Sequence, residues 1–324
     1  MDVTGPMLVL DSLTKTYADG TTAVTDLSLS VDRGEIAALV GPSGCGKSTT
    51  LRMVNRLIEP TSGTITLAGR DVTTGDPVEL RRGIGYVIQQ VGLFPHQRIL
   101  ANVMTVPSLL GTPKAKARAR AEELLHLVGL DPATYAGRYP HQLSGGQQQR
   151  VGVARALAAD PPVLLMDEPF GAVDPLERRR LQDEFRKLQQ DLGTTVVLVT
   201  HDLDEAVRLG DKVAVMAPGG RLAQWGTPAE VLAHPADDFV ASFVGSDSGL
   251  RRLSVTVISP DHLESLDGIN ASELAATLPV GATLEEALAL MLRDDRAVVG
   301  VTDGPRFLGV LTPAGVHAAL RASL

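Results

Sequence analysis

Three short apolar runs alternate with segments of helical periodicity along the chain. They cover residues 36–40, 162–166 and 194–200. Compact runs of this kind, bounded by polar residues, are typical of buried strands in a parallel sheet. Residues 7–95 and 160–217 alternate strand and helix patterns in this way, which predicts an α/β domain.

Between those two parts, the pattern of residues 97–158 turns helical. Apolar residues recur at helical spacing in 99–110, 115–128 and 146–159, which predicts a helical subdomain. Its one basic run, at 114–120, is spaced by alanines and is interpreted as a solvated helix face.

A polar stretch rich in Gly and Ser at 245–249 predicts a domain boundary, with domains at 1–245 and 246–324. Beyond it, residues 283–292 form an amphipathic pattern whose Thr283 can cap a helix. Two short strand patterns, at 297–301 and 307–311, precede a last helical pattern at 312–320. The second region is therefore expected to be a small α+β domain.

Composition favours two globular domains. A chain of 324 residues exceeds the usual size of a single core, and 44% of its residues are apolar. No apolar stretch reaches about 18 residues, so no membrane-spanning helix is expected. The N-terminus lacks the pattern of a secretory signal, and the single cysteine fits a reducing compartment. The net charge of −8 argues against a nucleic-acid partner.

The first chemical motif follows the first apolar run. Residues 41–48 match G-x-x-x-x-G-K-[ST] and open a helical segment at 47–58. Glycines let backbone N–H groups point at phosphate oxygens, and a helix N-terminus adds positive charge. Lys47 is expected to reach the β- and γ-phosphates of ATP, and Ser48 to ligate Mg²⁺. The candidate nucleotide contacts are Gly41, Pro42, Ser43, Gly44, Cys45, Gly46, Lys47, Ser48 and Thr49. Cys45 is either a thiol activated by the helix start or a small buried filler.

Two acidic residues close the second run. Asp167 is expected to hold the Mg²⁺ shell, and Glu168 to polarise a water towards the γ-phosphate. His201 follows the third run, at the carboxyl end of a predicted parallel strand, where α/β sheets gather ligand contacts. It is a candidate for a γ-phosphate contact.

A second Gly-rich site lies about a hundred residues after the first. Leu143, Ser144, Gly145, Gly146 and Gln147 stand in sequence there. Such a site is redundant if one chain holds one nucleotide alone. It makes sense if it serves a nucleotide held by a second copy of the chain.

In their order and spacing these motifs, with Gln89 and the segment 171–174, resemble the nucleotide-binding subunit of ATP-binding-cassette (ABC) transporters over residues 7–245. The resemblance implies a P-loop NTPase fold with a mixed sheet and a helical signature subdomain. It also implies a head-to-tail dimer that encloses two ATP molecules, with catalytic roles for Lys47, Gln89, Glu168 and His201. The implied metal contacts are Ser48, Gln89 and Asp167. The implied contacts to ATP from outside the first loop are Tyr17, Gln89, Ser144, Gly145, Gly146, Gln147, Asp167 and Asp174.

Tyr17 matches the aromatic that stacks on adenine in this family, although an ordinary strand-end tyrosine is the alternative. The resemblance also implies partners: integral membrane permease subunits, received in a groove beside Gln89, and indirectly an extracellular or periplasmic substrate-binding protein. The expected location is the cytoplasmic face of the cell membrane.

Peripheral segments bear on the transported solute. Residues 86–96, 139–142 and 237–245 resemble importers of quaternary amines such as glycine betaine, choline or carnitine. Residues 275–322 resemble one cystathionine-β-synthase (CBS) repeat, although Gly315 stands where the family often has a ribose-binding Asp. The alternatives are another importer, for example of methionine, or a non-transport ABC ATPase.

Overall fold

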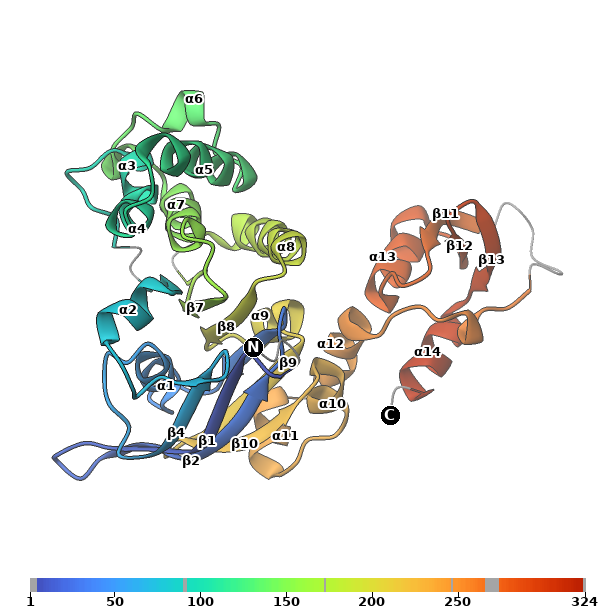
Figure 1. Cartoon of the computed structure of the whole chain (residues 1–324). Coiled ribbons are helices and arrows are strands. Elements are labelled where there is room, and N and C mark those ends of the chain that lie inside the picture. The colour runs from blue at the N-terminus through green and yellow to red at the C-terminus, as the bar shows by residue number, and fades with distance from the viewer. Residues whose placement is uncertain (1–4, 90–91, 172, 246, 266–273, 323–324) are drawn as a thin grey trace. The chain divides into compact units, whose positions relative to one another are not determined.

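The computed structural model describes residues 5–89, 92–171, 173–245, 247–265 and 274–322 (Figure 1). Gln90, Val91, Ala172 and Ser246, which fall in segments singled out above, lie outside the described residues. The chain forms two compact units, Met1–Trp225 and Gly226–Leu324. The predicted boundary near 245 stays a prediction; in the structure α10 of the second unit packs against α12.

A 10-stranded sheet runs through the first unit in the order β5-β4-β1-β2-β10-β9-β3-β8-β7-β6. The strands β3, β8, β7 and β6 pair in parallel, whereas β1 pairs with β2 and β4 in antiparallel fashion. The predicted mixed sheet is therefore present. Its strands are β1 (Leu8–Thr16), β2 (Thr22–Val31), β3 (Ile36–Val40), β4 (Ser62–Leu67), β5 (Arg70–Asp71), β6 (Ile84–Val87), β7 (Val163–Asp167), β8 (Thr195–Thr200), β9 (Lys212–Ala217) and β10 (Arg221–Gly226).

The three apolar runs became β3, β7 and β8, and every residue of these strands is buried. Parallel strands covered on both faces need continuous apolar runs rather than an alternating pattern. The sheet places the carboxyl ends of β3, β7 and β8 side by side, since β3 pairs with β8 and β8 with β7. The motifs that follow these strands are thereby brought to one edge.

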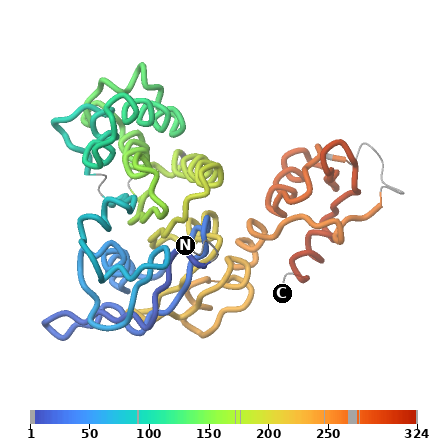
Figure 2. The backbone as a smooth tube through the Cα atoms, viewed as in Figure 1, coloured from blue at the N-terminus to red at the C-terminus, as the bar shows by residue number. Residues whose placement is uncertain are grey.

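Helices of the first unit fall into two groups (Figures 1 and 2). The helices α3 to α7 gather at one end of the unit, as the sequence predicted, while α1 and α9 lie against the sheet. The helices are α1 (Lys47–Val54), α2 (Pro77–Arg82), α3 (Ile99–Val103), α4 (Thr105–Leu109), α5 (Lys114–Leu127), α6 (Pro132–Tyr135), α7 (Gly145–Leu157), α8 (Pro175–Leu192) and α9 (Leu203–Leu209), with a 3₁₀ turn at Pro140–Gln142.

Two predicted helices were too long. The pattern at 99–110 forms two helices, α3 and α4, because Pro107 has no N–H to donate to the carbonyl of Val103. The pattern at 47–58 ends at Val54, where Arg56 adopts a left-handed conformation (φ 49°) that a helix cannot continue through.

The second unit contains a 3-stranded sheet in the order β11-β12-β13, with β11 parallel and β13 antiparallel to β12. Its core joins α13 and α14 to the inner faces of β12 and β13. Thr283 caps α13 in a reciprocal pair with Glu286, as predicted. The elements are α10 (Pro228–Ala233), α11 (Asp238–Val244), α12 (Ser248–Val255), a 3₁₀ turn (Pro260–His262), β11 (Leu274–Pro279), α13 (Leu284–Asp294), β12 (Val298–Asp303), β13 (Arg306–Leu311) and α14 (Pro313–Ala322).

Candidate nucleotide site

The phosphate-binding loop joins β3 to α1, as the sequence predicted. Gly41 (φ 156°) and Gly46 (φ 93°) are required by close backbone approach. A Cβ at Gly41 would stand 2.2 Å from the Met216 carbonyl oxygen, and one at Gly46 would stand 2.1 Å from the Ala23 carbonyl oxygen. No side chain caps α1, so its first N–H groups remain available for an anion.

Lys47 is buried and folds back over this loop. Its Nζ donates to the carbonyl oxygens of Gly41 (2.7 Å) and Pro42 (3.0 Å). The ammonium is thus held within the loop that is expected to take the phosphates. Ser43 and Gly44 are exposed, and Thr49 is partly buried in the first turn of α1. Cys45 is 1% exposed and belongs to the main core cluster, which fits the buried-filler interpretation rather than an accessible thiol.

Ser48 and Asp167 meet at the ends of α1 and β7. Ser48 Oγ donates to Asp167 Oδ1 over 2.8 Å. Burial raises the pKa of Asp167, and the negative charge of Glu168 adds to this, while the Ser48 hydrogen bond opposes it. Two oxygen donors side by side, one of them a desolvated carboxylate, suit a hard cation such as Mg²⁺, which takes few protein ligands and the rest from phosphates and water. The donor set therefore fits Mg²⁺.

Two residues from distant parts of the chain, Gln89 and His201, contact the Glu168 carboxylate. Gln89 Nε2 donates to Glu168 Oε2 (3.0 Å), and His201 Nδ1 lies 3.4 Å from Glu168 Oε1. Glu168 adopts a left-handed backbone conformation (φ 45°), unusual for a non-glycine residue, while its N–H bonds the Val199 carbonyl. At this turn the carboxylate of Glu168 contacts Gln89 and His201, whereas that of the adjacent Asp167 contacts Ser48.

The signature residues form the start of α7. Ser144 Oγ accepts from Gln147 N (3.3 Å), and Gln147 Oε1 accepts from Ser144 N (3.0 Å), a reciprocal capping pair. Gln147 Nε2 also donates to Tyr135 of α6. The motif is thus bound within the helical subdomain, while α1 lies beside the sheet (Figure 1). Ser144 and Gly145 are exposed.

Asp174 and Tyr17 are the two other residues for which the sequence predicts a contact to ATP. Asp174 immediately precedes α8, and its carbonyl accepts from Arg178 N (2.8 Å). Tyr17 is 39% exposed in the turn between β1 and β2, with Lys15 Nζ 5.3 Å from the ring centroid. An exposed ring of this kind is available for stacking.

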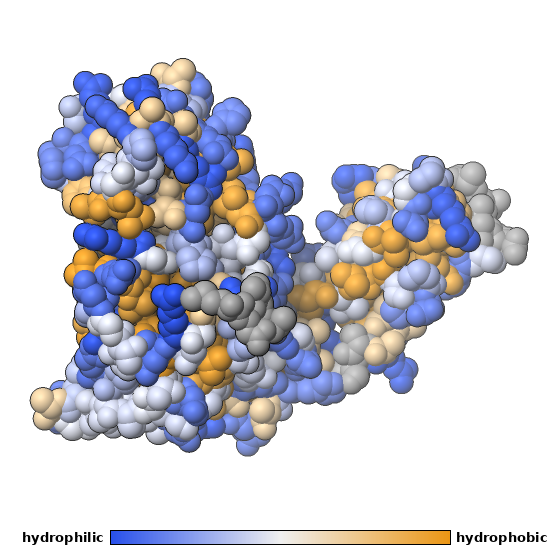
Figure 3. Space-filling view, viewed as in Figure 1, coloured by the Kyte–Doolittle hydropathy of each residue, from blue (hydrophilic) through white to orange (hydrophobic). Residues whose placement is uncertain are grey.

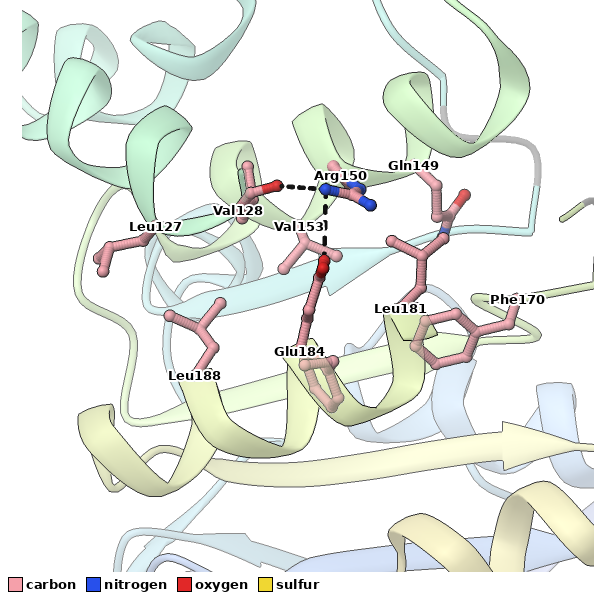
Figure 4. A pocket seen from close by; sticks show the side chains of 10 residues that line it. Leu127, Val128, Gln149, Arg150, Val153, Phe170, Leu181, Glu184 and Leu188 are labelled. Atoms are coloured by element: carbon pink, nitrogen blue, oxygen red, sulfur yellow. Dashed lines mark hydrogen bonds and ion pairs between the residues drawn. The ribbon is translucent and has the colours of Figure 1, made fainter. Parts of the chain in front are cut away.

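A small apolar cavity separates α7 from α8 (Figure 4) and is not the nucleotide site. It measures about 30 Å³ and holds none of the motif residues. Arg150 crosses its rim: Nη1 donates to the Val128 carbonyl (3.1 Å) and lies 3.3 Å from Glu184. The contact ties the helix that carries the signature to α8.

Several residues near the motifs were missed from the sequence. Asn102 is fully buried and bonds the backbone of Phe94, Gln97 and Arg98, which shapes the segment after Gln89. Arg178 and Glu205 lie beside the turn that carries His201. The available signal was a polar residue in the middle of an apolar helical pattern, which a single sequence does not distinguish from a solvated one.

Comparison with known proteins gives the class. Residues 24–171 match the ABC transporter family. Together with the relatives below, this shows that the chain belongs to the ATP-binding proteins of ABC transporters, which hydrolyse ATP to drive transport. The Bacillus subtilis "Choline transport ATP-binding protein OpuBA" is 48% identical over 307 residues, which are 92% of this chain and 78% of that one. The same organism's "Glycine betaine/carnitine/choline transport ATP-binding protein OpuCA" is 49% identical over 285 residues, 88% and 72% of the two chains.

A solved structure shares the fold. The ATP-binding cassette MJ0796, in a dimeric post-hydrolysis state bound to ADP and phosphate, is 36% identical with a TM-score of 0.61. The match covers 68% of this chain and 99% of that one. The predicted ABC cassette fold is therefore confirmed, and a cassette of this fold forms a nucleotide-bound dimer.

Proposed function

We propose that this chain is the ATPase subunit of an importer of quaternary-amine osmolytes: glycine betaine, choline or carnitine. The observation that carries the proposal is the similarity to transport proteins for these solutes at 48% and 49% identity over most of both chains. Quaternary ammonium groups are recognised by the faces of aromatic rings, and we place this recognition in the permease and the binding protein rather than in this ATPase.

The working unit is a head-to-tail dimer of two copies. Each ATP lies between Lys47 and the loop 41–49 of one chain and the Ser144–Gln147 helix start of the other. Ser48 and Asp167, with Gln89 nearby, would hold Mg²⁺, which would supply positive charge opposite the phosphates. The starts of α1 from one chain and α7 from the other point backbone N–H groups at phosphate oxygens. Hydrogen bonds from these N–H groups become stronger when the site closes and water is excluded. Asp174 lies at the same interface.

Glu168 orients and polarises the attacking water. Its carboxylate accepts a hydrogen bond from Gln89 and faces His201, so the three side chains form one polar cluster. His201 contacts the γ-phosphate of the nucleotide on its own chain. Tyr17 stacks on the adenine of that nucleotide.

Membrane permease subunits dock on the helical subdomain. A groove of about 750 Å³ lies there, lined by α3, α4 and the start of α5. Large apolar side chains are exposed on the helical subdomain and near Gln89, and apolar surface is visible on the first unit (Figure 3). They include Ile88, Phe94, Leu109 and Leu110. A helix docked on this subdomain acts on Gln89 through the chain segment that leads from Gln89 to α3, and a substrate-binding protein acts through the permease.

The second unit carries one CBS-like repeat at about 275–322. Supporting it is the element order β11-α13-β12-β13-α14, with β11 and β12 parallel. Gly315 has no side chain to accept from a ribose, and its N–H donates to Thr312 Oγ1 (3.0 Å). The repeat acts as a regulatory element of the dimer rather than as a nucleotide site.

The protein works at the cytoplasmic face of the cell membrane, held there by its permease. Across the described helices, none combines the length and the apolar character needed to span a bilayer. Attachment through a protein partner fits a chain of net charge −8, which an anionic membrane surface would repel.

Uptake measurements test the cargo. A strain lacking this subunit is complemented with the wild-type chain or with Glu168→Gln, and uptake of labelled betaine, choline, carnitine, proline and methionine is measured at low and high osmolarity. We expect the wild type alone to restore uptake of at least one quaternary amine, most strongly at high osmolarity. Restoration of methionine uptake only, or of no solute, would contradict the assignment of cargo.

A further inference from the structure

We infer that Arg178 is a positioning residue that couples the loop carrying Asp174 to the turn carrying His201. The inference rests on the proposed dimer, in which the Asp174 loop meets the partner chain. Arg178 lies in the first turns of α8, whose start immediately follows Asp174. Its guanidinium bridges the two segments within one chain.

One side of the bridge is the Asp174 loop. Arg178 Nη2 donates to the carbonyl oxygen of Val173 (3.2 Å), the residue before Asp174. The backbone N–H of Arg178 donates to the carbonyl of Asp174 (2.8 Å). Val173 is 5% exposed. The loop is therefore fixed to Arg178 both by main chain and by side chain.

The other side is the His201 turn. Arg178 Nη1 lies 3.8 Å from Oδ2 of Asp202, the residue after His201. Asp202 caps α9 by accepting from Asp204 N and Glu205 N, and its own N–H donates to Thr200 Oγ1 (3.0 Å). His201 is thus held between two anchored neighbours, one of which faces the Arg178 guanidinium.

The site is built to keep the cation in place. The Arg178 side chain is 28% exposed and that of Asp202 33% exposed, and the Arg178 Nε is buried without a hydrogen-bond partner. Charges that are partly withdrawn from water interact more strongly than solvated ones. By contrast, Arg180 on the same helix is 67% exposed and pairs only along the helix with Glu184.

A displacement of the Asp174 loop moves the Val173 carbonyl and hence the guanidinium. Movement of the guanidinium shifts Asp202 and with it the imidazole of His201, which faces Glu168. Closure of the Asp174 loop against the partner chain thereby changes the position of His201, the residue expected to contact the γ-phosphate. Such coupling needs a physical chain of contacts whose arrangement both sites bias.

A double-mutant cycle in ATP turnover tests the coupling. The variants are Arg178→Gln, Asp202→Asn and the pair; Asn keeps the helix cap while removing the charge. We expect each single change to lower kcat about ten-fold. The double variant should have the same kcat as either single variant, because all three variants lose the same Arg178–Asp202 contact. KM for ATP should stay within about two-fold. Arg180→Gln is the matched control and should leave kcat unchanged.

Two further measurements separate this inference from the dimer on which it rests. ATP-dependent dimerisation is measured in Glu168→Gln and in Glu168→Gln combined with Arg178→Gln, and both should dimerise. If the single variant Glu168→Gln forms no ATP-dependent dimer, the proposed function is overturned. The coupling is overturned if Glu168→Gln dimerises but its combination with Arg178→Gln does not. It is also overturned if Arg178→Gln and Asp202→Asn lower kcat by factors that multiply in the double variant, or if Arg180→Gln lowers kcat as much as Arg178→Gln does. Arg178→Lys, which keeps the charge, should recover part of kcat; thermal unfolding checks that all variants fold.

Discussion

Burial controls the ionisation of Glu205, in the first turn of α9. Glu205 is 6% exposed, its Oε2 accepts from Thr200 Oγ1 (2.7 Å), and its Oε1 is buried without a hydrogen-bond partner. Burial raises its pKa from 4.5 to about 7; the Thr200 hydrogen bond opposes this, and Asp202 adds to it. The carboxyl therefore keeps its proton in the fold at a pH where an unfolded chain loses it.

The raised pKa of Glu205 makes the stability of the fold depend on pH. Below pH 4.5 the group is neutral in both states and carries no penalty; between 4.5 and about 7 the unfolded state alone ionises. Stability then falls as pH rises, by about 3 kcal/mol at most for one such carboxyl. Glu205→Gln removes this dependence. Its thermal midpoint relative to wild type should rise from pH 5 to pH 8; an unchanged difference would contradict the buried neutral carboxyl.

At this scale the sequence identified candidate residues from motifs but not the contacts that depend on the fold. Lys47, Ser48 and Asp167 follow from a motif and a strand end, and the structure brings Ser48 and Asp167 together. The adjacent Glu168 has other partners, Gln89 and His201, and a left-handed backbone. Arg178 and Glu205 carry no pattern of their own, because their partners come from a loop and a strand that only the fold brings near.

Helix starts are the elements that organise the site. α1 begins without a side-chain cap and α7 begins with the reciprocal Ser144–Gln147 pair. Ser144 is thus both a candidate phosphate contact in the partner's site and the cap of its own helix. The second role was not evident from the motif, since Ser-x-x-Gln was interpreted only as part of the signature.

Ser144→Ala separates these roles. Losing the cap should lower the free energy of unfolding by about 1 kcal/mol, and losing the phosphate contact should lower turnover about ten-fold. ATP affinity of the monomeric chain should stay unchanged, because the contact belongs to the other copy. The measurements are thermal unfolding, steady-state turnover and ATP titration.

Thr283→Ala is the control for the cap. It removes the same kind of reciprocal pair from α13, far in sequence from the nucleotide motifs. It should destabilise its unit by a similar amount and leave turnover unchanged. Lost ATP binding in monomeric Ser144→Ala would contradict a role in the partner's site.

Element boundaries were less predictable than element types. In the second unit α13, α14, β12 and β13 were expected, whereas α11, α12 and β11 were missed. Leu274–Pro279 contains a single β-branched residue and ends in Pro, so it has little strand character of its own. It is a strand because it pairs in parallel with β12, across the whole of α13. Pairing of that range is not visible in a local pattern.

At the scale of the whole molecule, the central claim is that catalysis is shared between two copies. One chain holds a complete phosphate loop with Asp167 and Glu168, and a separate signature helix start bound within its helical subdomain. The isolated chain is then an incomplete enzyme. Its turnover should depend on encounter with a second copy, and defects in the two halves should complement one another.

Mixing two inactive variants tests the claim most directly. Lys47→Ala disables the phosphate loop. Gly145→Asp adds a negative charge at the exposed start of α7, where it suits the helix but repels phosphate; Gly145→Asn is its uncharged control. If the sites are shared, each mixed dimer has one site with both halves intact. An equal mixture should then recover up to about a quarter of wild-type turnover, because half of the dimers are mixed. Turnover no higher than that of the separate variants would contradict a site built from two chains.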